Sequence, residues 1–117
     1  MPCHSVRAGV KLTETQKHEA IEAYRKAIEN AFHEVSDALI GYRKETEQRG
    51  QEELLVAALR DTDRLARLRY QGGLDSYLQV LDAERNLFQG ELELAAERRE
   101  EILAVVQLYR ALGGGWQ

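Results

Sequence analysis

The sequence predicts an all-α chain, a long antiparallel helical hairpin of the coiled-coil type. The 117 residues include one proline, Pro2, and are rich in the helix-forming residues Ala, Leu, Glu, Arg and Gln. Apolar residues recur every three or four positions in two long stretches, which is the spacing of one face of a helix. Between these stretches lies a short segment with two glycines, 71–76, of the kind that joins two helices.

The first long helix is expected over residues 13–70, after an irregular tail over residues 1–12. The tail contains Pro2 and Gly9, and Thr13 with Gln16 fits a capping box at the start of the helix. The apolar or small positions with a stride of three or four are Ala20, Tyr24, Ile28, Ala31, Val35, Leu39, Tyr42, Leu55, Leu59, Leu65 and Leu68.

The turn is expected at 71–76 and the returning helix at 77–112, followed by a Gly-rich tail at 113–117. A glycine of the turn is expected to adopt the left-handed conformation that ends a helix, and Ser76 with Gln79 fits a second capping box. Two apolar rows on the returning helix predict neighbours on two sides. One row is Tyr77, Leu81, Phe88, Ala95, Ile102, Val105, Tyr109 and Leu112, and the other is Leu78, Leu87, Leu92, Leu94 and Val106.

Composition and charge exclude several classes of protein. The net charge is −4, with 16 basic and 20 acidic residues, so we expect no nucleic-acid partner. The single cysteine, Cys3, excludes an internal disulfide and a multi-cysteine metal site. No run of apolar residues is long enough for a transmembrane helix. Arg7, Lys11 and Glu14 interrupt the N-terminal region, so we expect no signal peptide in the chain as given.

No group of residues indicates catalysis. His18 and His33 are 15 residues apart on one expected helix, which separates them by about 22 Å and prevents them from sharing a metal ion. The glycines at 113–115 lack the lysine and the following helix of a phosphate-binding loop. We therefore predict no catalytic residues, no metal site and no cofactor, and we do not expect an enzyme.

Apolar residues stand unusually close to the turn. Leu74, Tyr77, Leu78 and Val80 lie within or directly after it, whereas an exposed turn normally carries polar residues. An apolar surface of this kind is a candidate docking site for another protein.

Three segments resemble one known family. The run 69–85 resembles the periplasmic tip motif of the TolC/OprM outer membrane factors, which are the exit ducts of tripartite efflux pumps. Residues 24–39 resemble the long descending helix of these proteins, and 106–116 resembles the closing motif of the OprM-like, NodT-type lipoprotein branch. The resemblance runs in one register from about 9 to 116, and the sequence is identified as a C-terminal fragment of such a protein.

The resemblance implies a passive exit duct for drugs and other toxic compounds. In the full-length parent, a homotrimer would build a periplasmic α-barrel, and this chain would supply one helix pair of it. The implied partners are a periplasmic adaptor (membrane fusion) protein and, through the complex, an inner-membrane efflux pump. The parent would lie in the outer membrane and periplasm, and the fragment would self-associate because one antiparallel partner cannot cover both apolar rows.

The resemblance also implies roles for residues of the tip. It places Tyr70 and Asp82 at the gate and constriction, where a ring of carboxylates favours cations. The TolC branch carries a second aspartate in place of Gln79 and an arginine in place of Asp75, so the gating network is expected to differ in detail. The residues implied for adaptor docking are Gly72, Gly73, Leu74, Ser76, Leu78 and Val80.

Two alternatives remain open from the sequence. The chain could be a free-standing helical hairpin that serves as a protein-interaction module in the cytoplasm, or an inert truncated remnant of the channel. The acidic composition and the expected lack of a signal peptide favour the first alternative. The three ordered motifs and the length of the first helix favour the efflux channel.

Overall fold

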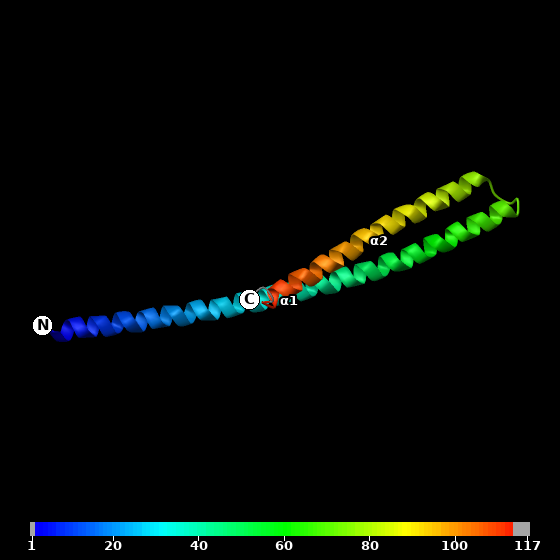
Figure 1. Ribbon diagram of the computed structural model, residues 1–117. Coiled ribbons are helices and arrows are strands. Elements are labelled where there is room, and N and C mark those ends of the chain that lie inside the picture. Colours follow the sequence, from blue (N-terminus) through cyan, green and yellow to red (C-terminus); the bar gives the residue numbers. More distant parts are fainter. Residues whose placement is uncertain (1, 114–117) are drawn as a thin grey trace. The chain divides into compact units, whose positions relative to one another are not determined.

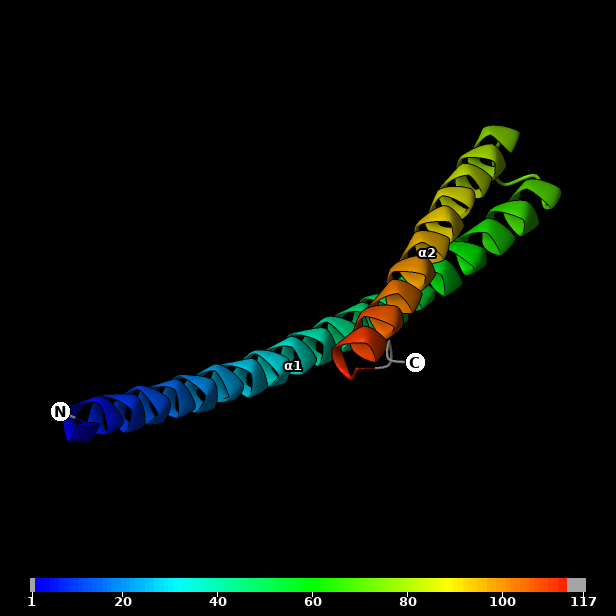
Figure 2. The ribbon, with the colours of Figure 1, turned by 60° about the vertical axis from the view of Figure 1, so that its left-hand side comes forward.

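The computed structural model describes residues 2–113 and contains two helices, α1 (Pro2–Gln71) and α2 (Tyr77–Ala111). No strand occurs within the described residues. The two views of the ribbon show α2 lying beside the part of α1 that leads into the turn (Figures 1 and 2). The predicted all-α helical hairpin is therefore confirmed.

The described residues divide after Asp37 into two units. The first unit is a stretch of α1 in which every described side chain from Cys3 to Glu34 is exposed. The second unit contains the rest of α1, the turn and α2, and it holds all the buried residues of the described chain. The hairpin proper is the second unit.

The helix α1 begins earlier than the sequence predicted. It starts at Pro2 instead of Thr13, so the prediction of an irregular tail over residues 1–12 is wrong for residues 2–12, and Met1 lies outside the described residues. Proline is tolerated in the first helical turn because its missing N–H would have no partner there, and Gly9 costs only about 1 kcal/mol within a helix. Thr13 is not a cap, because its hydroxyl donates to the carbonyl oxygen of Gly9 at 2.9 Å inside the helix.

The turn closes α1 with a Schellman motif. The N–H of Leu74 donates to the carbonyl oxygen of Arg69 at 2.8 Å, and the N–H of Gly73 donates to that of Tyr70 at 3.0 Å. Gly73 has a φ of 72° and is the glycine that adopts the left-handed conformation, while Gly72 stays outside it. A residue with a side chain at position 73 would be strained in this backbone conformation.

The helix α2 begins directly after Ser76, which is its N-cap residue. The Ser76 side chain makes no capping hydrogen bond, so the predicted capping box is absent; the N–H of Gln79 donates instead to the Ser76 carbonyl oxygen at 3.1 Å. The helix ends at Ala111, one residue before the expected boundary at 112. Of the expected tail at 113–117, only Gly113 lies within the described residues, with a φ of 81°.

The two arms of the hairpin meet along a narrow seam. Its most deeply buried apolar residues are Val56 from α1 and Val80 from α2, each 1% exposed. Gly90 lets the arms approach closely, because a Cβ at that position would lie 2.6 Å from Cδ1 of Leu59 and 3.6 Å from Cγ2 of Val56. A small residue on α2 thus accommodates larger side chains of α1, as in knobs-into-holes packing.

Seam residues repeat with alternating steps of three and four on both helices, which is the spacing of a left-handed coiled coil. On α1 the buried or half-buried positions with this spacing are Ala38, Tyr42, Glu45, Arg49, Glu52, Val56, Leu59, Asp63 and Ala66. On α2 they are Val80, Ala83, Leu87, Gly90, Leu94, Glu97, Glu101, Ala104, Leu108 and Ala111.

The seam is not the main apolar row that the sequence predicted for α2. In the hairpin, that row is exposed, including Phe88 at 62% and Tyr109 at 62%. In the second predicted row, Leu87 and Leu94 lie in the seam, whereas Leu78 and Leu92 are exposed. Small and charged residues occupy much of the inner face of the hairpin. The large apolar residues that the sequence pattern picks out therefore lie mostly on its outer faces.

Candidate functional site

The tip of the hairpin displays apolar side chains to solvent. Leu74 is 72% exposed and Leu78 is 70% exposed. Of the six residues predicted for adaptor docking, five are exposed in the hairpin: Gly72, Gly73, Leu74, Ser76 and Leu78. These five residues define the tip surface.

Val80 does not belong to the tip surface, and its placement there is corrected by the structure. It is 1% exposed and is the first seam residue of α2. Because α2 begins at Tyr77, Val80 is already one turn into the helix, on the side that faces α1. Its apolar side chain stabilises the hairpin instead of presenting a surface.

The turn is braced by an ion pair and by a pair of aromatic rings. The Arg69 guanidinium donates from Nε to Oδ2 of Asp75, and this hydrogen bond raises the pKa of Arg69. The rings of Tyr70 and Tyr77 lie 5.2 Å apart between centroids and are tilted by 57°. The ion pair joins the end of α1 to the turn, and the ring contact joins the end of α1 to the start of α2, so the backbone that carries Leu74 is bracketed by two contacts.

The two residues predicted for the gate have different neighbours in the hairpin. Tyr70 contacts Tyr77 across the turn, while Asp82 lies 3.2 Å from the Arg85 guanidinium on its own helix. A shallow groove beside the turn brings Asp82 together with Gln79, Asp75 and Arg69. Tyr70 is not part of the lining of this groove.

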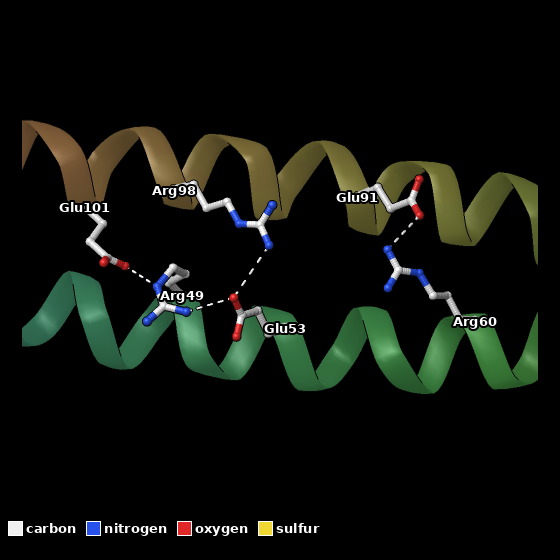
Figure 3. A network of polar contacts seen from close by, with 6 residues as sticks. All are labelled: Arg49, Glu53, Arg60, Glu91, Arg98 and Glu101. Carbon is white, nitrogen blue, oxygen red and sulfur yellow. Dashed lines mark hydrogen bonds and ion pairs between the residues drawn. The ribbon is translucent and has the colours of Figure 1, made fainter.

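Ion pairs cross from one arm to the other along the hairpin. Figure 3 shows that Arg49 pairs with Glu101, while Arg98 lies 3.6 Å from Glu53 and Arg60 lies 3.3 Å from Glu91. Nearer the tip, Arg67 joins Glu84 of α2 to Asp63 of α1. Together these pairs set the antiparallel register of the two helices.

The acidic neighbours of Arg49 and Arg67 favour the charged form of these two side chains. Hydrogen bonds to Glu101 and then to Glu53 raise the pKa of Arg49, and the hydrogen bond to Asp63 is the main cause that raises the pKa of Arg67. The apolar pattern of the sequence did not place charged residues in the seam. Arg49, Glu97 and Glu101 are spaced three or four residues from other seam residues on their own helices. This spacing was the sequence signal that could have identified them as seam residues.

Neither a group of metal-binding side chains nor a membrane-spanning helix is found among the described residues. Within residues 2–113, no group of three His, Cys, Asp or Glu side chains is placed to hold a metal ion. In the same range, neither helix has a segment that is long and apolar enough to cross a membrane.

Comparisons with known proteins agree over nearly the whole chain. The family model described as outer membrane efflux protein matches residues 3–114. The chain is 42% identical over 112 residues to the probable efflux pump outer membrane protein TtgC of Pseudomonas putida, and the match covers 96% of this chain and 23% of that protein. It is 38% identical over 112 residues to the outer membrane protein OprJ of Pseudomonas aeruginosa, covering 94% of this chain and 23% of that protein.

A relative from another genus and a solved structure give the same result. The cation efflux system protein CusC of Escherichia coli is 38% identical over 111 residues, covering 95% of this chain and 24% of that protein. The crystal structure of a membrane protein from Pseudomonas aeruginosa matches with a TM-score of 0.68 and 36% identity, over 94% of this chain and 25% of that one. The chain thus spans about a quarter of the length of the relatives it matches, and over that quarter it belongs to the outer membrane efflux protein family.

Proposed function

We propose that this chain forms one helical hairpin in the periplasmic α-barrel of an outer membrane efflux channel. The channel would be a passive exit duct for drugs and other toxic compounds, and the tip surface would dock a periplasmic adaptor protein. The observation that carries this proposal is the exposure of Leu74 in the turn and of Leu78 just after it, where the turn is already closed by its own hydrogen bonds. A preformed apolar surface loses little conformational freedom when a partner covers it.

The outer faces of the hairpin support assembly with further copies. Phe88, Ile102 and Tyr109 on α2 are each more than half exposed, as are Leu65 and Leu68 on α1. Burying one such side chain contributes roughly 1.5–3 kcal/mol. Neighbouring hairpins in a homotrimeric barrel would cover both faces, and the chain alone would self-associate through the same surfaces.

We also propose the gate role that the resemblance implies for Tyr70 and Asp82. Asp82 is exposed, so copies of the hairpin around an axis could bring several such carboxylates to one constriction. A ring of carboxylates attracts cations at a narrow opening. Tyr70 contacts Tyr77 across the turn. Through this contact it would help to fix the position of the tip next to the ring of Asp82 carboxylates. The pump that supplies energy would reach the channel through the adaptor.

The substitution Leu78→Asp in the full-length parent tests the docking role. A charge at this position must be desolvated when the adaptor binds, which costs several kcal/mol unless the charge is paired. We expect loss of drug resistance and of adaptor cross-linking, while the trimer and its insertion into the membrane are retained. The measurements are growth in the presence of drugs, cross-linking to the adaptor, and trimer recovery from outer membranes.

Two matched variants separate docking from folding. Gln79→Asp adds the same charge to the neighbouring exposed residue, where the TolC branch itself carries an aspartate, and we expect it to retain resistance. Val80→Asp places the charge in the seam and should reduce trimer recovery by destabilising the hairpin. If Leu78→Asp abolishes the trimer as Val80→Asp does, Leu78 is a packing residue and the docking assignment fails.

A further inference from the structure

The seam of the hairpin changes in chemistry along its length. Toward the tip its most deeply buried residues are apolar, with Val56, Val80 and Leu94 among them. The seam residue Asp63 is paired with Arg67. Farther from the tip, Glu52 on α1 and Glu97 on α2 occupy positions of the same three- and four-residue repeat. Apolar residues normally fill these positions of a coiled coil, so two carboxylates there call for a physical explanation.

Ion pairs on either side place Glu52 and Glu97 in one layer of the seam. Glu53 and Arg98, which directly follow them in the sequence, are joined across the helices at 3.6 Å. One step farther from the tip, Arg49 pairs with Glu101 (Figure 3). In this antiparallel register Glu52 and Glu97 share a layer, and the negative charge of Glu52 acts on Glu97 across the seam.

Neither carboxylate is neutralised by a neighbouring cation. Within residues 2–113, no ion pair reaches Glu52 or Glu97, because Arg49 is committed to Glu101 and Glu53, and Arg98 to Glu53. The oxygen Oε2 of Glu52 and the oxygen Oε2 of Glu97 are both buried, and neither has a hydrogen-bond partner. A buried carboxylate oxygen without a partner is costly, and two like charges in one layer add repulsion to that cost.

The electrostatics of Glu97 follow from this position. Burial is the largest cause that raises the pKa of Glu97, followed by the negative charges of Glu45 and Glu52 on α1 and of Glu100 on its own helix. The arginines near it, Arg49 and Arg98, are paired with other carboxylates. The charged groups on both helices therefore disfavour a negative charge on Glu97.

We propose that the Glu52–Glu97 layer takes up a proton and thereby makes the hairpin a pH-responsive element, more stable in mildly acidic than in alkaline solution. A protonated carboxyl group gains an O–H donor while its partner remains an acceptor. One proton can therefore both remove the repulsion and supply the missing hydrogen bond in the layer. The inference is independent of the proposed efflux function, because it concerns only contacts within the hairpin.

The direction of the effect follows from proton linkage. The folded chain binds a proton at Glu97 at pH values where the unfolded chain, with the ordinary glutamate pKa of 4.5, has already released it. The free energy of unfolding therefore rises as the pH falls from above the folded pKa toward 4.5, and the effect ends once the unfolded chain is protonated as well. Carboxylates with a cation partner act in the opposite direction and at lower pH.

The test is the pH dependence of unfolding for the whole chain and three variants. Thermal unfolding is followed by circular dichroism between about pH 8 and about pH 5, at one chain concentration. For the unmodified chain, we expect the melting temperature to rise as the pH falls. Glu97→Gln and Glu52→Gln should raise the melting temperature at pH 8 and lose most of this pH dependence. Glu47→Gln removes the same charge from an exposed position of α1, and this variant should retain the pH dependence of the unmodified chain.

Carbon NMR of the glutamate carboxyl groups supplies a readout that does not depend on association. Glu97, assigned by its absence in Glu97→Gln, should titrate at a higher pH in the folded chain than in the urea-unfolded chain. Equal midpoints in the two states, or a Glu97→Gln variant with the same pH dependence as Glu47→Gln, would overturn the proposal.

Discussion

Shortening one leucine of α2 should distinguish the seam from the outer faces. Leu94 is 6% exposed, whereas Leu92, two residues before it, is 50% exposed. The substitutions Leu94→Ala and Leu92→Ala remove the same atoms from the same helix, so helix propensity changes equally in both. The difference between the two variants therefore measures burial in the hairpin.

The expected magnitude follows from the burial of each side chain. A leucine loses three carbon atoms on truncation to alanine, and at about 0.8 kcal/mol for each buried methylene this amounts to roughly 2.4 kcal/mol for Leu94. A seam between only two helices is open at its sides and can collapse, so little is added for a cavity, and we expect about 2–3 kcal/mol. For Leu92 on the outer face, we expect less than about 1 kcal/mol.

Urea unfolding followed by far-UV circular dichroism measures both values. The experiment is carried out at two chain concentrations, because any contribution from association would move the midpoint with concentration. The Leu94 variant should unfold at a clearly lower urea concentration in both cases. If Leu92→Ala costs as much as Leu94→Ala at the lower concentration, α1 and α2 do not pack through the seam described above, and the layers inferred from it fail as well.

Two further predictions concern the assembled state. In sedimentation, the isolated chain should form dimers or larger species because its outer apolar faces are uncovered, and a compact monomer at high micromolar concentration would contradict this. In the reconstituted full-length channel, Asp82→Ala should change the conductance or weaken the block by cations through loss of a carboxylate ring. Unchanged conductance and unchanged cation block would place Asp82 away from the constriction.

The hairpin and its turn could be predicted because their signals are local. Two glycines interrupt a long run of helix-forming residues, and Ser76 stands directly before the second helix. Gly73 provides the left-handed residue, which depends only on neighbouring backbone groups. The start of α1 differs from the prediction because Pro2 stands where a helix can begin and Gly9 is accommodated inside the helix.

The seam could not be found by following large apolar residues. Ala83, Gly90 and Ala104 fill seam positions of α2 with little side-chain volume, and Glu97 and Glu101 fill others with charge. The pairing of Arg49 with Glu101 depends on the register of two helices that meet only after the turn. Such a contact joins residues far apart in the sequence, so no local pattern reveals it. Val80 was predicted to lie on the tip surface because it is close to the turn in sequence. Its burial depends on its position in the seam repeat, which is known only once the two helices are paired.

The distribution of side chains indicates different roles for the two kinds of surface. Ion pairs such as Arg60–Glu91 and Arg67–Glu84 favour one register, since a shift of one helix along the other would separate their charges. Half-exposed pairs of this kind contribute little net stability, and the apolar part of the seam is short. The large side chains that could contribute more, such as Phe88 and Tyr109, point away from the partner helix. Charged and small residues therefore determine how α1 and α2 pair. Most of the exposed apolar area of the hairpin remains available for contact with neighbouring hairpins in the proposed barrel.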